Sequence, residues 1–436
     1  MYFCIMKPNK TKFLLLSILT AAVILGIVVL VVFIVFIISL FTECGSNKNK
    51  KLTAADTIAV ANNLPVDTAL QSRLKEFSLR PRPNGKFAFM VYDITAQKPV
   101  YGCNEDVAMS SASCMKLLSG IAGLHLMGCN YIYYTTMFMR GKVAADGCLN
   151  GDVAFSGGLN PQLQPVDLND FAKALSQKGV KKIGGKMIVD LVAKQPVQSE
   201  AHWYPWDLSF SKYGLLYKGD TRIIAALKSA LRSQGIAVKD SQIVQAPTPK
   251  GMTAVHSDTL AIDEVVKKMW KNSSNTQATA MLYTIGHRVG PKQHPATAGV
   301  AYLRRFLHDE VGMTHKSLVI HDGCGLCTHN HLSPRALTAV LDYGYRDPDI
   351  REALERNLSV SGTDGTLKRE MTGQKTRGKI KAKTGTLSHP YGISSLAGIC
   401  DGTDGHKLAF AIMDCEMSVL DARVLQRKLC EALVAK

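Results

Sequence analysis

Residues 13–41 place the strongest limit on what this chain can form. The run "FLLLSILTAAVILGIVVLVVFIVFIISLF" contains no charged residue, and its only polar residues are Ser and Thr. A helix needs about 20 apolar residues to cross a bilayer, whereas the core of a cleaved signal peptide has about 7–15. The run is long enough to span a membrane with some tilt. It predicts an uncleaved transmembrane anchor within residues 1–44, followed by a polar linker at 45–55.

The remaining composition is that of a folded protein. The chain has 436 residues, of which 46% are hydrophobic and 20% are charged, so it can bury one large domain or two ordinary ones. The net charge is +17, but the basic residues are scattered and form no dense tract. This predicts no nucleic-acid partner. Either the surface is simply basic and soluble, or it is attracted to an anionic environment such as cell-wall polymer or lipid headgroups.

The chain has eleven cysteines, an odd number, so at least one thiol stays unpaired within an exported chain. The segment "CGLCTHNH" at 324–331 resembles zinc-ligand spacing. Four ligands within eight residues would require a very tight loop, and no second cluster in the sequence supports such a site. We therefore predict neither a metal nor another cofactor.

Hydrophobic patterning predicts strands and helices along the whole chain. Residues 86–94 read as a strand. Residues 95–102 read as a turn followed by a second strand that pairs with the first. A helix is predicted at 111–128 with Ser110 or Ser111 as its cap, and short strands at 131–160. The further elements are helices at 166–179, 219–235, 260–270 and 418–434, and strands at 184–190, 379–387, 394–400 and 406–416.

Three short motifs occur in one order. A serine and a lysine three residues apart, Ser113 and Lys116, begin the predicted helix at 111–128. S-S-N at 273–275 follows a helix, and K-T-G at 383–385 lies on a strand. The first pattern is weak alone, because it also occurs with Ser72 and Ser209. The ordered set, each member in its expected element, is specific.

The residue types of this set suit nucleophilic catalysis. The hydroxyl of Ser113 needs a base within hydrogen-bond reach, and Lys116 lies on the same helical face. The pKa of that lysine must fall before it can act as a base, and burial together with a second cation, Lys383, would lower it. Ser273 can pass a proton to a leaving amine. Asn275 can hold a substrate amide and orient Lys116.

The strand with K-T-G can lie beside an extended peptide. Lys383, Thr384 and Thr386 would then meet a terminal carboxylate, and Gly385 would leave room for the passing substrate. The backbone N–H groups of Ser113 and Thr386 are candidates for an oxyanion hole.

With these motifs, residues 85–434 resemble the class C low-molecular-mass penicillin-binding proteins, the D-alanyl-D-alanine carboxypeptidase/endopeptidase family. The resemblance implies an α/β (α+β) transpeptidase-like fold, in which helices flank a five-stranded antiparallel sheet. It places the catalytic domain at 56–128 and 256–436 and an inserted subdomain at 129–255. Further matching segments are "GGLNPQL" (157–163), "GGKMIVD" (184–190), "HWYPWD" (202–207), "DGCGLCTHNHLSP" (322–334) and "SGTDGTL" (361–367).

The chain departs from the family pattern in three places. The 160 residues between Ser113 and Ser273 are fewer than the family leads us to expect, so one inserted subdomain is expected and a nested one is absent. The family's "DGSGLS" is "DGCGLC" here, and its "SDN" is "SSN". These changes keep the reacting side chains.

The resemblance implies a serine D,D-peptidase that trims or cleaves peptidoglycan stem peptides through an acyl-enzyme on Ser113. β-Lactams should acylate the same serine. A single-pass anchor would hold the catalytic domain on the exported side of the cell membrane. The likeness also implies that Asp190 faces the substrate cleft and meets the free amine of the stem peptide, although a carboxylate at a strand end more often forms a cap or turn.

Two other functions stay open. One is a penicillin-sensing or scaffolding cell-wall protein with little turnover, which the intact set of reacting residues disfavours. The other is a β-lactamase, which the long gap between the first two motifs disfavours. The sequence also shows no E-x-x-L-N glutamate at a suitable distance after Ser273.

Overall fold

The computed structural model describes residues 64–80, 84–387, 389 and 392–435. The predicted anchor and linker, residues 1–55, lie outside this range. Among the helices of the described residues, none combines the length and apolar character needed to cross a bilayer.

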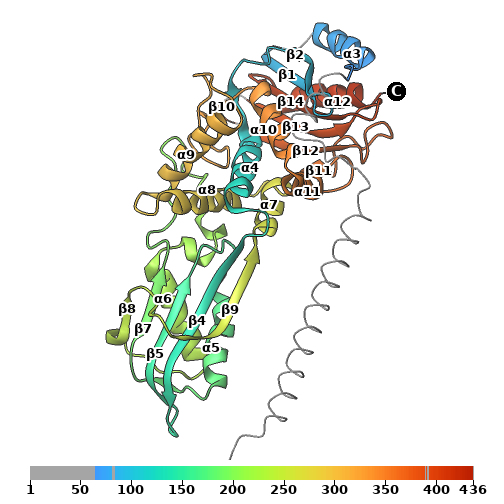
Figure 1. The fold of residues 1–436 in the computed structure, drawn as a ribbon. Coiled ribbons are helices and arrows are strands. Elements are labelled where there is room, and N and C mark those ends of the chain that lie inside the picture. The colour runs from blue at the N-terminus through green and yellow to red at the C-terminus, as the bar shows by residue number, and fades with distance from the viewer. Residues whose placement is uncertain (1–63, 81–83, 388, 390–391, 436) are drawn as a thin grey trace, which may run out of the picture. The chain divides into compact units, whose positions relative to one another are not determined.

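One sheet has six strands in the order β11-β12-β13-β14-β1-β2, and every neighbouring pair is antiparallel (Figure 1). The prediction of five strands missed β11, because two residues are too few to show an alternating pattern. The other strands follow the predicted segments to within a few residues. The bounds are β1 Lys86–Asp93, β2 Lys98–Cys103, β11 Ser359–Val360, β12 Ile380–Leu387, β13 Ile393–Asp401 and β14 Lys407–Cys415.

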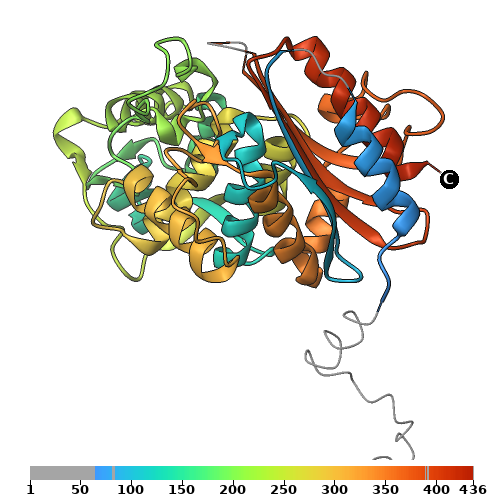
Figure 2. The ribbon, with the colours of Figure 1, turned by 90° about the horizontal axis from the view of Figure 1, so that it is seen from above.

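Helices cover both faces of this sheet. On one face, α3 (Thr68–Leu79) and α12 (Val419–Val434) lie side by side (Figure 2). Leu70, Leu74 and Phe77 of α3 share one apolar cluster with side chains of α12 and of the sheet, as their i, i+4 and i+7 spacing on one helical face allows. On the other face lie α4 and α10, which join a larger apolar cluster. The sheet is therefore buried on both sides.

Further helices pack on α4 and α10, and two of the three motifs lie at the starts of helices in this group. Their bounds are α4 Met115–Met127, α7 Ile262–Trp270, α8 Asn275–Val289, α9 Pro295–Arg305, α10 Pro334–Arg346 and α11 Pro348–Asn357. The helix predicted from 111 begins instead as a 3-10 turn, Ala112–Cys114, before α4. Neither Ser110 nor Ser111 caps it with a side chain, so that prediction was wrong. The carbonyl of Ser111 instead accepts the N–H of Cys114 and closes the turn.

A second, mixed sheet is built from residues 132–261. Its order is β8-β7-β5-β4-β9, and β6 also pairs with β5. The short strands expected at 131–160 are in fact two long ones joined by a turn at 144–147, and they pair antiparallel from Thr135 with Gly157 to Val143 with Leu149. The bounds are β4 Ile132–Val143, β5 Cys148–Gly157, β6 Lys182–Ile183, β7 Met187–Leu191, β8 Ile243–Gln245 and β9 Thr253–Ala261, with α5 Leu168–Gln177 and α6 Asp220–Ser233 beside them. A two-stranded pair, β3 Met109–Ser110 with β10 His331–Leu332, completes the strands of the described residues.

Candidate active site

Ser113 and Lys116 meet at the start of α4. Ser113 lies in the 3-10 turn, and Lys116 follows in the first turn of the helix. The Lys116 Nζ donates to Ser113 Oγ at 2.7 Å. By contrast, Ser72 Oγ donates to the carbonyl of Thr68 on an exposed face of α3. Of these two S-x-x-K serines, Ser113 is the one held by its lysine inside the protein.

Lys116 is fully buried and is oriented by two more acceptors. Its Nζ donates to Asn275 Oδ1 at 2.8 Å and to the carbonyl of Cys324 at 2.5 Å. Burial lowers the pKa of Lys116, because an ammonium ion is poorly solvated there. A lowered pKa makes the neutral amine, the form that a general base requires, easier to reach.

Ser273 and Lys383 form the second serine–lysine pair. Lys383 Nζ donates to Ser273 Oγ at 2.8 Å and to the Thr384 carbonyl at 2.6 Å. Burial, and next the positive charge of Lys116, lower the pKa of Lys383 to about 7. Ser273 has a φ of +57°, which is costly for a residue other than glycine. The backbone at Ser273 is therefore strained, in a conformation that directs its hydroxyl toward Lys383.

The loop after residue 321 holds the Cys324 carbonyl in place. The buried carboxylate of Asp322 accepts the N–H groups of Cys324 at 3.0 Å, Gly325 at 2.6 Å and Cys327 at 2.8 Å. Gly325 has a φ of +80°, and a Cβ there would lie 1.8 Å from the Ala112 carbonyl oxygen. The loop therefore packs directly against the turn that carries Ser113. Sequence reasoning missed this role, because a main-chain carbonyl is the same in every residue type.

Gly385 lies where strand β12 passes the same turn. A Cβ at this position would stand 2.1 Å from Ser395 Oγ and 2.7 Å from the Ser111 carbonyl oxygen. Ser395 Oγ itself donates to that carbonyl at 2.6 Å. A side chain here would thus collide with the protein, and Gly385 also lines the cavity beside Ser113, so the predicted room for a substrate stays a prediction.

A cavity of about 350 Å³ opens beside the two serines. Thr384 and Thr386 line it, while Lys116 and Lys383 lie buried beneath Ser113 and Ser273. Thr384 Oγ1 donates to Thr366 Oγ1 at 2.8 Å. Sequence reasoning assigned no role to five further lining residues, Thr366, Glu370, Arg423, Gln426 and Arg427. The segment "SGTDGTL" that contains Thr366 was a usable signal.

Asp190 is not brought to this group. It lies on β7 in the second sheet, half-buried, and its Oδ2 accepts the N–H of Thr248 at 2.8 Å. It does not line the cavity beside Ser113. The contact is that of a carboxylate that caps a neighbouring segment, and the predicted role toward a substrate amine stays a prediction.

Comparison with known proteins is consistent with this geometry. The profile of the D-Ala-D-Ala carboxypeptidase 3 (S13) family matches residues 70–213 and 216–434. The D-alanyl-D-alanine carboxypeptidase DacB of Haemophilus influenzae is 20% identical over 453 residues, which cover 83% of this chain and 92% of that protein.

Solved structures support the fold. Penicillin binding protein 4 of Haemophilus influenzae matches with a TM-score of 0.67 at 18% identity, covering 82% of this chain and 97% of that one. The predatory peptidoglycan endopeptidase Bd3459 of Bdellovibrio bacteriovorus matches with a TM-score of 0.52 at 14% identity, covering 78% and 89%. The architecture is the mixed α/β fold of penicillin-binding proteins.

Proposed function

Since the chain belongs to the D-Ala-D-Ala carboxypeptidase 3 (S13) family, we propose that it cleaves peptidoglycan stem peptides with Ser113 as its nucleophile. The enzyme is a serine-type D-alanyl-D-alanine carboxypeptidase or endopeptidase, a hydrolase. The observation that carries the proposal is the contact of 2.7 Å between Ser113 Oγ and the fully buried amine of Lys116.

The two serine–lysine pairs divide the proton transfers of acylation. Neutral Lys116 accepts the Ser113 proton as Oγ attacks the carbonyl carbon between two D-alanines. Ser273, whose Oγ accepts a hydrogen bond from Lys383, passes its own proton to the leaving amine as the C–N bond breaks and regains one from the lysines. Water then attacks the ester on Ser113 and releases the acid product. Asn275 keeps Lys116 directed at Ser113 throughout.

The cavity suits a peptide with a terminal carboxylate. Thr384 and Thr386 place hydroxyl groups at its wall, and Arg427 brings a positive charge, whereas Arg423 pairs with Glu370 at 3.3 Å. The N–H groups of Ser113 and Thr386 would stabilise the oxyanion. A β-lactam carries the same pairing of reactive carbonyl and carboxylate, and it would acylate Ser113.

The location of the enzyme follows from the sequence outside the described residues. The apolar run at 13–41 would hold the protein in the cell membrane as a single-pass anchor. Peptidoglycan lies on the exported side, so the catalytic domain would be exported.

Release of D-alanine from a stem pentapeptide tests the function, with labelling by a fluorescent penicillin as a second readout. Ser113→Ala should lower release about a thousandfold or more and abolish labelling, because it removes the nucleophile. Ser72→Ala and Ser209→Ala are the matched controls and should keep both. Labelling that survives in Ser113→Ala would exclude it as the nucleophile. Labelling of the wild type without release would favour the penicillin-sensing alternative.

A further inference from the structure

A second cluster of metal-ligating side chains lies outside the group around Ser113. One carboxylate oxygen, two imidazole nitrogens and one thiol sulfur, from Glu200, His202, His321 and Cys327, all lie within 4.8 Å of one another. A third imidazole, that of His329, borders the cluster, with its Nδ1 4.0 Å from Cys327 Sγ. These groups come from two segments more than a hundred residues apart in sequence.

We propose that this cluster is a structural zinc site. Zinc takes thiolate, imidazole and carboxylate ligands, usually four, at about 2.0–2.3 Å, and a site with four protein ligands is closed and structural. Ligand atoms around such an ion lie within about 4 Å of one another. The spacing here needs only small side-chain rotations. His202 is exposed and has room to rotate, whereas Cys327 is fully buried.

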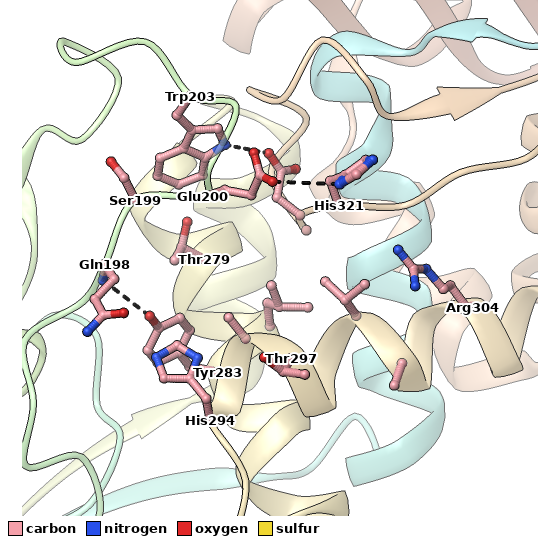
Figure 3. Close-up of a pocket in the computed structure, with 16 residues that line it drawn as sticks. Gln198, Ser199, Glu200, Trp203, Thr279, Tyr283, His294, Thr297, Arg304 and His321 are labelled. Atoms are coloured by element: carbon pink, nitrogen blue, oxygen red, sulfur yellow. Dashed lines mark hydrogen bonds and ion pairs between the residues drawn. The ribbon is translucent and has the colours of Figure 1, made fainter.

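Glu200 contacts two histidines of the cluster. Its Oε1 lies 2.8 Å from His202 Nδ1 and 3.6 Å from His321 Nδ1. The rings of His202 and His329 are 4.5 Å apart between centroids. Figure 3 shows Glu200 and His321 pointing toward one another from different segments at the rim of a cavity of about 440 Å³. Two imidazoles beside one carboxylate and one thiol match a metal shell better than they match a surface ion pair.

The sequence argument against zinc does not apply to this set. It rested on four ligands from "CGLCTHNH" alone, which would need a very tight loop. In the structure, Cys327 has its partners in His321 and in the distant Glu200 and His202, and Cys324 is not a member. The second segment removes the geometric difficulty.

A zinc ion here would fasten the loop that positions the base. Cys327 donates its N–H to Asp322, the carboxylate that also holds Cys324, and the Cys324 carbonyl accepts from Lys116. Trp203 donates its indole N–H to the same carboxylate at 2.7 Å. The ion would therefore tie the segment of Glu200 to the loop behind Ser113, and it would stabilise that loop without touching a substrate.

The test uses the full-length protein, stripped of metal with a chelator, and two probes, Zn²⁺ by calorimetry and Co²⁺ by absorption. We expect one Zn²⁺ per chain, a thiolate-to-cobalt charge-transfer band, and a midpoint of thermal unfolding that rises with Zn²⁺. Cys327→Ser should remove the band, and both Cys327→Ser and His321→Gln should weaken zinc binding by about tenfold or more.

Two control variants make the same types of substitution, one at a histidine and one at a cysteine, outside the cluster. His308→Gln breaks an exposed histidine–aspartate pair, and Cys148→Ser removes a half-buried thiol; both should keep full binding. Fluorescent penicillin labelling identifies folded samples. If Cys327→Ser is not labelled by penicillin, His202→Gln is used in its place. His202 lies at an exposed position, so this change disturbs the fold less. A labelled wild type that binds no Zn²⁺, or a charge-transfer band that persists without Cys327, would overturn the site while leaving Ser113 unaffected.

Discussion

At the scale of single residues, the site depends on two buried lysines that face different serines. Both pKa values fall mainly because burial removes water from the ammonium groups. Two buried cations close together also disfavour each other, so their protonation is coupled. A charge on one of these lysines therefore disfavours a charge on the other, as the lowered pKa of Lys383 beside Lys116 shows.

The first prediction concerns the charge of Lys383. Lys383→Ala should lower kcat/KM for peptides with a free terminal carboxylate more than for the same peptides with an amidated end. A charged hydrogen bond is worth about 1.5–3 kcal/mol, or roughly 10–100-fold in kcat/KM. Steady-state kinetics on matched peptides measures the difference. Lys381→Ala is the control, because that lysine lies on the same strand but pairs with Glu355 at 2.6 Å. An equal loss on both peptides would show that Lys383 does not sense the carboxylate.

The second prediction is a pH dependence with a defined sign. Lys383, whose pKa is about 7, is an ammonium ion below that pH and a neutral amine above it. The ratio of kcat/KM for the acid peptide to that for the amide peptide should therefore fall as pH rises through about 7. Taking the ratio cancels the deprotonation of Lys116, which affects both peptides. In Lys383→Ala the ratio should not change with pH. A ratio that is flat in the wild type would place the charge on another residue.

The meeting of the five candidate residues was predictable because each is a distinctive side chain at a fixed spacing. Ser113, Lys116, Ser273, Asn275 and Lys383 meet as the motifs suggested. The Cys324 carbonyl was not predictable, since it depends on a fold in which residues 208 positions apart touch. The close packing of Gly385 against Ser111 and Ser395 was hidden likewise, because it depends on contacts with two other segments.

At the scale of elements, periodicity predicted most helices and strands and failed where tertiary contacts decide. The closing helix and the three strands before it begin and end within a few residues of their predicted bounds. The two-residue strand β11 exists only because β12 offers it a partner. Ser111 does not cap α4, since the chain leaves β3 through Ala112 with a positive φ and forms a tight turn first.

The third prediction tests whether Asp190, near the end of strand β7, recognises the amine of a stem peptide. Asp190→Asn should lower kcat/KM severalfold or more for stem peptides with a free side-chain amine, and change little for acetylated peptides and for penicillin acylation. A partly desolvated ion pair should contribute more than the 0–1 kcal/mol of an exposed one. Paired kinetics on the two peptides is the measurement. If both peptides slow equally, or neither does, the carboxylate serves only the Thr248 backbone N–H that it already accepts.

At the scale of the whole molecule, the chain combines an apolar N-terminal run with a basic remainder. The two serine–lysine contacts were predictable from linear motifs. The cluster of Glu200, His202, His321 and Cys327 was not, because its members come together only after the two segments pack.

The fourth prediction follows from residues 13–41. The full-length protein should sediment with the membrane fraction and leave it with detergent but not with high salt, because burial of an apolar helix does not depend on ionic strength. Removing residues 1–44 should move the protein to the soluble fraction with penicillin labelling intact. Fractionation followed by labelling measures both. Full-length protein that is soluble, or released by salt alone, would contradict an anchor.

The segment that forms the second sheet begins and ends at neighbouring points of the structure. Ile132, at the start of β4, is paired with Ala261, at the end of β9, and the helices α4 and α7 that flank them carry or precede the catalytic motifs. Whatever stands between these two residues spans the same short gap, and the entropy of closing a loop grows only slowly with its length. Evolution can therefore enlarge, trim or exchange this segment without moving Ser113 relative to Ser273. A protein engineer could do the same, by grafting a foreign recognition module onto that single pair of strand ends.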